Sequence, residues 1–154
     1  MFIGRKQELE SLNNIYSKSG FGMTVIYGRR RIGKSTLIAE FIKNKKAVFY
    51  TASKVGAVRN LELFSDQVIS VLDPTLSDIK FSSVESVFDF ITNRLTDEKL
   101  IIVIDDEEYY KTVKDTIVNM YGFNQDISVI IYQDNYEKLV INLSEVMLHV
   151  WWTI

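Results

Sequence analysis

Residues 28–35 read GRRRIGKS and match, without a mismatch, the pattern G-x-x-x-x-G-K-[S/T] of loops that bind nucleotide phosphates. Glycines at positions 28 and 33 let the backbone turn tightly and aim its N–H groups at phosphate oxygens. We expect Lys34 to reach the β- and γ-phosphates and the Ser35 hydroxyl to coordinate Mg²⁺. The alternative is a glycine-bearing turn that contains lysine and serine by chance. The residues predicted to contact the nucleotide in this segment are Gly28, Arg29, Arg30, Arg31, Ile32, Gly33, Lys34, Ser35 and Thr36.

A second group of candidate residues follows an apolar segment, LIIVI at 100–104, which is continued by Asp105, Asp106 and Glu107. An apolar strand that ends in acids is the Walker B pattern of proteins that hydrolyse nucleotides. Asp105 would hold Mg²⁺ through water opposite Ser35, and Asp106 or Glu107 would polarise the attacking water. With Lys34, these two acids are the predicted catalytic residues. The alternative for the acids is a solvated turn after a strand.

Strands and helices are predicted to alternate along the chain, which is typical of an α/β fold with a mostly parallel sheet. Residues 100–104 lack polar alternation, as expected of a parallel strand that is covered on both faces. Ser82 and Glu85 have the spacing of a capping box before the helical stripe of residues 84–95. Strands are predicted at 23–27, 47–51 and 100–104, and helices at 5–16, 35–43, 61–72 and 84–95.

The pattern is weaker after residue 110. A helix is predicted over 113–121 and a strand over 127–132, whereas 139–143 and 146–152 suit either a strand or a helix. The apolar end, VWWTI at 150–154, is expected either to pack into the fold or to meet a partner, including a second copy of the chain.

Composition indicates an ordinary globular domain: 154 residues, 47% hydrophobic and 25% charged, with one histidine and no cysteine. Disulfide scaffolds, cysteine zinc sites and thiol nucleophiles are therefore excluded. No apolar run is long enough to span a bilayer and no signal peptide is recognisable, so a cytoplasmic protein is expected.

Residues 1–60 carry 12 Lys/Arg and 3 Asp/Glu, and the rest of the chain is acidic. This asymmetry suits phosphate and metal binding, nucleic-acid binding or a solvated surface. For Arg29, Arg30 and Arg31 of the loop, we favour a position beside the phosphates over nucleic-acid binding.

Three segments together resemble the archaeal-type ATPases, in the STAND branch of the AAA+-like P-loop NTPases. They are FIGRKQELE at 2–10, YGRRRIGKS at 27–35 and LIIVID at 100–105. The resemblance covers about residues 1–110, and residues 111–154 are expected to complete the same domain. It implies a three-layer, ASCE-type core in which another strand separates the phosphate-loop strand from the Walker B strand. It also implies ATP as ligand, Mg²⁺ as cofactor, and a Gly4-Arg5 segment near the adenine.

The chain departs from that family in two respects. Asp106 stands where family members usually have glutamate, and the chain is short, so we expect a truncated core that lacks the helical lid domain. By position alone, Gln133 or Asn135 could face the γ-phosphate. No arginine follows Arg94, so a C-terminal arginine finger is not available within the chain.

The sequence thus predicts a Mg-ATP-binding domain with slow or partner-dependent ATP hydrolysis. Three alternatives stay open: a nucleotide-gated binding switch without turnover, a small-molecule P-loop kinase, and a degraded or joined ATPase fragment with a structural role.

Overall fold

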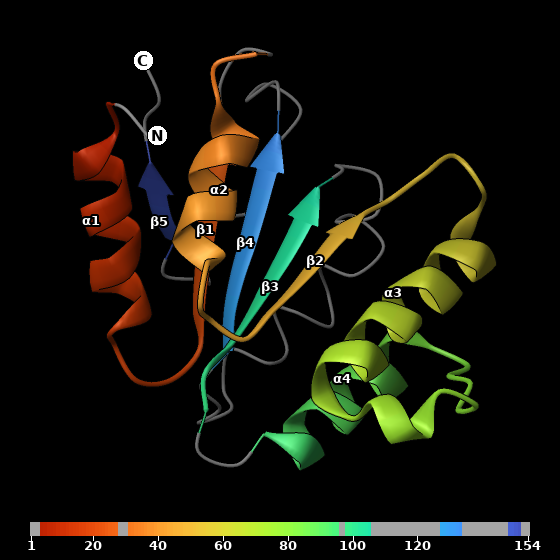
Figure 1. The fold of residues 1–154 in the computed structure, drawn as a ribbon. Coiled ribbons are helices and arrows are strands. Elements are labelled where there is room, and N and C mark those ends of the chain that lie inside the picture. Colours follow the sequence, from red (N-terminus) through yellow and green to blue (C-terminus); the bar gives the residue numbers. More distant parts are fainter. Residues whose placement is uncertain (1–3, 28–30, 96–97, 106–126, 134–147, 152–154) are drawn as a thin grey trace.

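The computed structural model describes residues 4–27, 31–95, 98–105, 127–133 and 148–151. Helices and strands alternate through most of this part of the chain, as predicted (Figure 1). In chain order the elements are α1 (Lys6–Tyr16), β1 (Gly22–Tyr27), α2 (Lys34–Ile42), β2 (Ala47–Thr51), α3 (Ala57–Leu72), the 3₁₀ helix η1 (Pro74–Leu76), α4 (Val84–Arg94), β3 (Leu100–Asp105), β4 (Ile127–Gln133) and β5 (Leu148–Trp151).

The strands form one sheet in the order β2-β3-β4-β1-β5, and every neighbouring pair is parallel. β4 therefore lies between the phosphate-loop strand β1 and the Walker B strand β3, which confirms the predicted ASCE arrangement. In register, Tyr27 is opposite Gln133, and Asp105 is opposite both Tyr132 and Thr51. The carboxyl ends of β1, β4, β3 and β2 thus meet at one edge of the sheet.

Helices cover both faces of this sheet, so the predicted three-layer α/β fold is confirmed. On one face, α1 and α2 pack through Leu12, Ile38 and Phe41 against β1, β3 and β4. On the other face, α3 and α4 pack through apolar side chains that include Phe64 and Phe88. All five residues of 100–104 are fully buried, as expected of a strand between two helical layers.

The N-terminus of α4 differs from the prediction by one residue. The helix is capped by Ser83, not by Ser82, and Glu85 does not close the capping box. The Ser83 Oγ accepts from the Ser86 N–H at 3.2 Å, and the Ser86 Oγ accepts from the Ser83 N–H at 3.3 Å. A second serine thus serves at the position where the box usually holds glutamate or glutamine.

The later part of the chain contributes two strands to the same sheet. The strand predicted at 127–132 is confirmed as β4, and residues 148–151 form a strand rather than a helix. The predicted elements at 113–121 and 139–143 lie outside the described residues. Within the described part, no helix combines the length and apolar character that a membrane crossing needs.

Candidate nucleotide-binding site

The phosphate-loop motif has the predicted setting: it follows β1 and leads directly into α2. Gly33 is the N-cap of α2 with φ 83°, and its carbonyl oxygen accepts from the Leu37 N–H at 3.0 Å. A Cβ at this position would meet no atom within 4 Å, so the left-handed backbone, not space, favours glycine here. Gly28, Arg29 and Arg30 lie outside the described residues.

The first turn of α2 presents three of the predicted ligands. Lys34 is buried, with 5% of the residue exposed, whereas Ser35 and Thr36 are exposed. The start of a helix carries the positive end of the helix dipole, and Lys34 adds a full positive charge at the same place. Lys34 at this helix start suits a group that meets the negative charge of a phosphate.

Asp105 is the last residue of β3 and is half-buried at the carboxyl edge of the sheet. Its carbonyl oxygen accepts from the Ala52 N–H at 3.2 Å, which joins the end of β2 to the end of β3. The Asp105 carboxylate and the Ser35 hydroxyl are hard oxygen donors, which Mg²⁺ prefers, so these residues fit the implied ion. Asp106 and Glu107, the predicted catalytic acids, lie outside the described residues.

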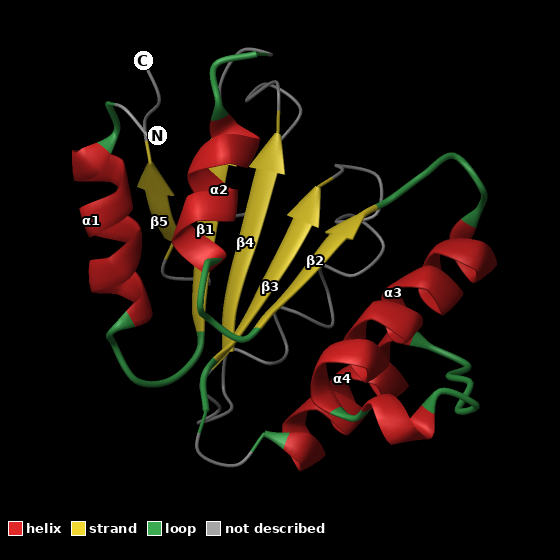
Figure 2. Cartoon of the chain, in the orientation of Figure 1, coloured by secondary structure: helices red, strands yellow, loops and turns green. Residues whose placement is uncertain are grey.

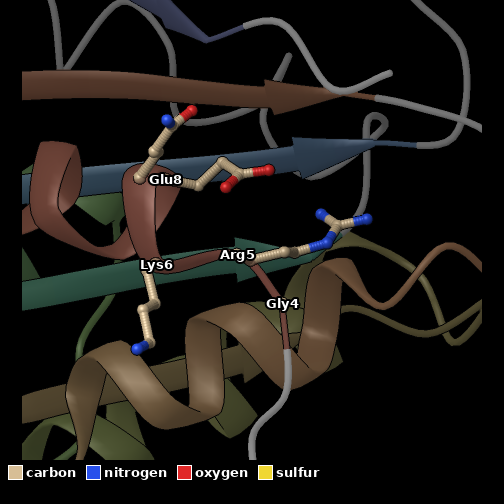
Figure 3. A pocket seen from close by; sticks show the side chains of 5 residues that line it. Gly4, Arg5, Lys6 and Glu8 are labelled. Atoms are coloured by element: carbon tan, nitrogen blue, oxygen red, sulfur yellow. The ribbon is translucent and has the colours of Figure 1, made fainter.

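A pocket of about 420 Å³ lies at the start of α1, lined by Gly4, Arg5, Lys6, Gln7 and Glu8 (Figure 3). The Arg5 guanidinium donates through Nη2 to the carbonyl oxygen of Ile32, in the phosphate loop. The two motifs that the sequence suggested separately, Gly4-Arg5 and residues 28–35, are thus in direct contact. Sequence reasoning placed both near the nucleotide but did not predict this hydrogen bond.

Asn60 is a residue of this edge that sequence reasoning missed. It lies in α3 and is 8% exposed. Its side chain bonds the loop between β2 and α3, which is drawn in green in Figure 2. Its Oδ1 accepts from the Tyr50 hydroxyl at 2.7 Å and from the Ser53 N–H at 3.1 Å, while its Nδ2 donates to the Ser53 carbonyl at 2.9 Å. An amide side chain one position before the apolar stripe that begins at Leu61 was the available signal.

The predicted contact of Gln133 or Asn135 with the γ-phosphate stays a prediction. Gln133 ends β4 opposite Tyr27, which is the backbone position that the prediction requires. Asn135 lies outside the described residues.

Comparison with known proteins matches almost the whole chain to one family. Residues 2–148 match the family described as an ATPase domain found predominantly in Archaea. Two proteins of Methanocaldococcus jannaschii are similar: uncharacterized protein MJECL04 is 30% identical over 141 residues, covering 92% of this chain and 29% of that protein. Uncharacterized ATP-binding protein MJ0423 is 46% identical over 46 residues, which are 30% of this chain and 78% of that protein.

Among solved structures, the STAND protein PH0952 of Pyrococcus horikoshii, which carries a tetratricopeptide repeat sensor, has the same fold. Its TM-score is 0.60 at 23% identity, and the match covers 97% of this chain but 22% of that one. The chain therefore spans less than a third of MJECL04 and of PH0952. By its phosphate loop, its strand order and its match over residues 2–148, the chain belongs to the archaeal-type P-loop ATPase family.

Proposed function

We propose that the chain binds Mg-ATP at the carboxyl edge of its sheet and hydrolyses it slowly or only with a partner. The observation that carries the proposal is the buried Lys34 at the first turn of α2, directly after the left-handed Gly33. This places a cation and the N–H groups of the first helical turn at the point where family members bind phosphate.

Each residue of the proposed site then has a defined task. Lys34 and the N–H groups at the start of α2 bind the phosphates, and the Gly4-Arg5 segment lines the pocket for the nucleoside. Ser35 and Asp105 hold Mg²⁺, which when bound neutralises charge on the transferring phosphoryl group. Asp106 or Glu107 orients the attacking water, and Asp106 is one methylene shorter than the usual glutamate.

Turnover assays with single variants test this proposal. Lys34→Ala and Asp105→Asn should each lower the ATP hydrolysis rate at least about a hundredfold, because each removes charge stabilisation of the transferred group. Lys43→Ala is the matched control, since Lys43 is exposed at the other end of α2 and pairs weakly with Glu40 at 3.9 Å. Equal rates in the wild type and in both site variants would refute it.

A second function, a nucleotide-gated binding switch without turnover, is favoured by Asp106, which stands where family members usually have glutamate. The rate of ATP hydrolysis per protein molecule distinguishes a slow ATPase from a switch without turnover. A specific rate that rises with protein concentration indicates that a second copy completes the site, whereas tight binding with no hydrolysis at any concentration favours the switch. Assignment to the STAND branch belongs to the same proposal, supported by the likeness to PH0952.

We further propose that residues 111–154 complete the ATPase domain. The support is that β4 and β5 flank β1 in the same sheet. Removal of residues 148–154 should lower the melting temperature, because β1 would lose a neighbouring strand; an unchanged melting temperature would refute the proposal.

A further inference from the structure

The carboxyl end of β3 is held in part by the backbone that follows β2. In the register of the sheet, Asp105 lies beside Thr51 of β2 on one side and Tyr132 of β4 on the other. One residue past β2, the Ala52 N–H donates to the Asp105 carbonyl oxygen at 3.2 Å. The backbone of Asp105, from which its carboxylate extends, therefore depends on where Ala52 is held.

Asn60 fixes the backbone directly after Ala52. Its Oδ1 accepts from the Ser53 N–H at 3.1 Å and its Nδ2 donates to the Ser53 carbonyl oxygen at 2.9 Å, so one amide side chain binds both polar groups of one residue. Because peptide units are planar, only the φ and ψ angles of Ala52 separate the peptide that donates to Asn60 from the peptide that donates to Asp105. A displacement of Ser53 therefore displaces the donor of the Asp105 bond.

The Asn60 side chain is itself firmly anchored. It extends from α3, which packs on the sheet through the fully buried Phe64, one helical turn further along (Figure 1). The Tyr50 hydroxyl, from β2, donates to Asn60 Oδ1 at 2.7 Å, and the Tyr50 ring meets that of Phe64 edge-on at a centroid distance of 5.4 Å. Displacing this buried amide is costly, because its polar atoms would lose their partners.

We propose that Asn60 is a positioning residue for Asp105 as a ligand of Mg²⁺. This role rests on the proposed function, in which Ser35 and Asp105 hold the ion, and it lies outside both sequence motifs. Asn60 acts through Ser53 and Ala52 and needs no contact with Mg²⁺ or ATP. Residues that orient a metal ligand typically contribute about 10- to 100-fold to metal affinity. Because Asn60 holds the backbone of the ligand and not its carboxylate, we expect an effect near the lower end of that range.

The contribution of Mg²⁺ to ATP affinity tests this role, because it separates the ion from the rest of the nucleotide site. Titration calorimetry, well below the melting temperature of each variant, compares ATP binding in excess Mg²⁺ with ATP binding in EDTA. Mg²⁺ should strengthen binding in the wild type, and Asp105→Asn should remove most of this enhancement. Asn60→Ala should lower the enhancement about five- to tenfold and leave the affinity in EDTA unchanged. A role confined to fold stability would not alter the enhancement in folded protein.

Two variants serve as matched controls. Tyr50→Phe removes the hydroxyl that donates to Asn60 but keeps both bonds to Ser53, and Ser70→Ala changes an exposed position of the same helix. Both should retain the wild-type enhancement. Asn60→Gln, whose amide is displaced by one methylene, should lower it and serves if Asn60→Ala does not fold.

The outcomes separate this role from the proposed function. A wild-type enhancement in folded Asn60→Ala or Asn60→Gln, or an equal loss in Ser70→Ala, would overturn the role of Asn60 and leave nucleotide binding intact. ATP binding by the wild type that Mg²⁺ does not strengthen would remove the metal role of Asp105, and the role of Asn60 with it. Failure of the wild type to bind ATP would instead remove the proposed function.

Discussion

The most specific stability prediction concerns Asn60, whose side chain supports the loop beside Asp105. Asn60→Ala removes three side-chain hydrogen bonds, one with the Tyr50 hydroxyl and two with the Ser53 backbone. At about 1 kcal/mol each they sum to roughly 3 kcal/mol, and the better helix propensity of alanine returns about 0.6 kcal/mol. We expect a net loss of about 2–3 kcal/mol, or a fall in melting temperature of about 5–10 °C for a chain of this size.

Urea unfolding followed by circular dichroism measures this loss. Ser70→Ala is the control, because the Ser70 hydroxyl bonds the Gln67 carbonyl on an exposed face of the same helix. That variant should stay within about 0.5 kcal/mol of the wild type. A double-mutant cycle of Asn60→Ala with Tyr50→Phe should show a coupling free energy of about 1 kcal/mol between the two side chains. A loss below about 1 kcal/mol in Asn60→Ala would refute the assignment of Asn60 as the support of this loop.

Three further predictions concern single residues. The buried Ser128 hydroxyl has no partner in the described part of the structure, so Ser128→Ala should leave stability unchanged or raise it by about 1 kcal/mol in urea unfolding; a clear loss would reveal a partner. The Thr75 hydroxyl, the Thr75 N–H and Arg94 lower the pKa of Asp73 below its usual value, so its stabilising effect is present above the unfolded-state pKa and is lost as pH falls through the folded-state pKa. Asp73→Asn should therefore flatten the stability profile in acid, and a profile parallel to that of the wild type would contradict this. Gly33→Ala should lower the free energy of unfolding by about 1 kcal/mol, because alanine is strained in the left-handed backbone conformation of this position, and it should weaken the binding of ATP. Urea unfolding measures the first effect, and an equally stable variant would show that the turn relaxes without cost.

The parts of the site that follow from local chemistry were predictable from the sequence. The loop before α2 was recognised because its glycines, lysine and serine have a fixed spacing that phosphate binding requires. β3 was recognised because its five apolar residues without alternation suit a strand covered on both faces. The position of β3 in the sheet, separated from β1 by β4, was predicted from the family resemblance, because hydrophobic periodicity does not determine strand order.

Contacts between distant segments were not predictable, because nothing local specifies them. The bond from Arg5 to Ile32 depends on how α1 lies against the start of α2, and the bonds of Asn60 depend on where β2 ends relative to α3. Residues 148–151 were ambiguous because a short apolar run has the same pattern in a strand and in a helix. The cap of α4 differed by one residue because adjacent serines at 82 and 83 are equally good caps, and only the first turn distinguishes them.

The central claim, that this edge of the sheet binds nucleotide, is tested most directly by titration calorimetry with Mg-ATP. We expect micromolar binding, equivalent to about −8 kcal/mol, in the wild type and in Lys43→Ala, and its loss in Lys34→Ala. Circular dichroism of the ligand-free proteins verifies that all three are folded. Absence of binding in the folded wild type, or equal affinity in Lys34→Ala, would contradict the account.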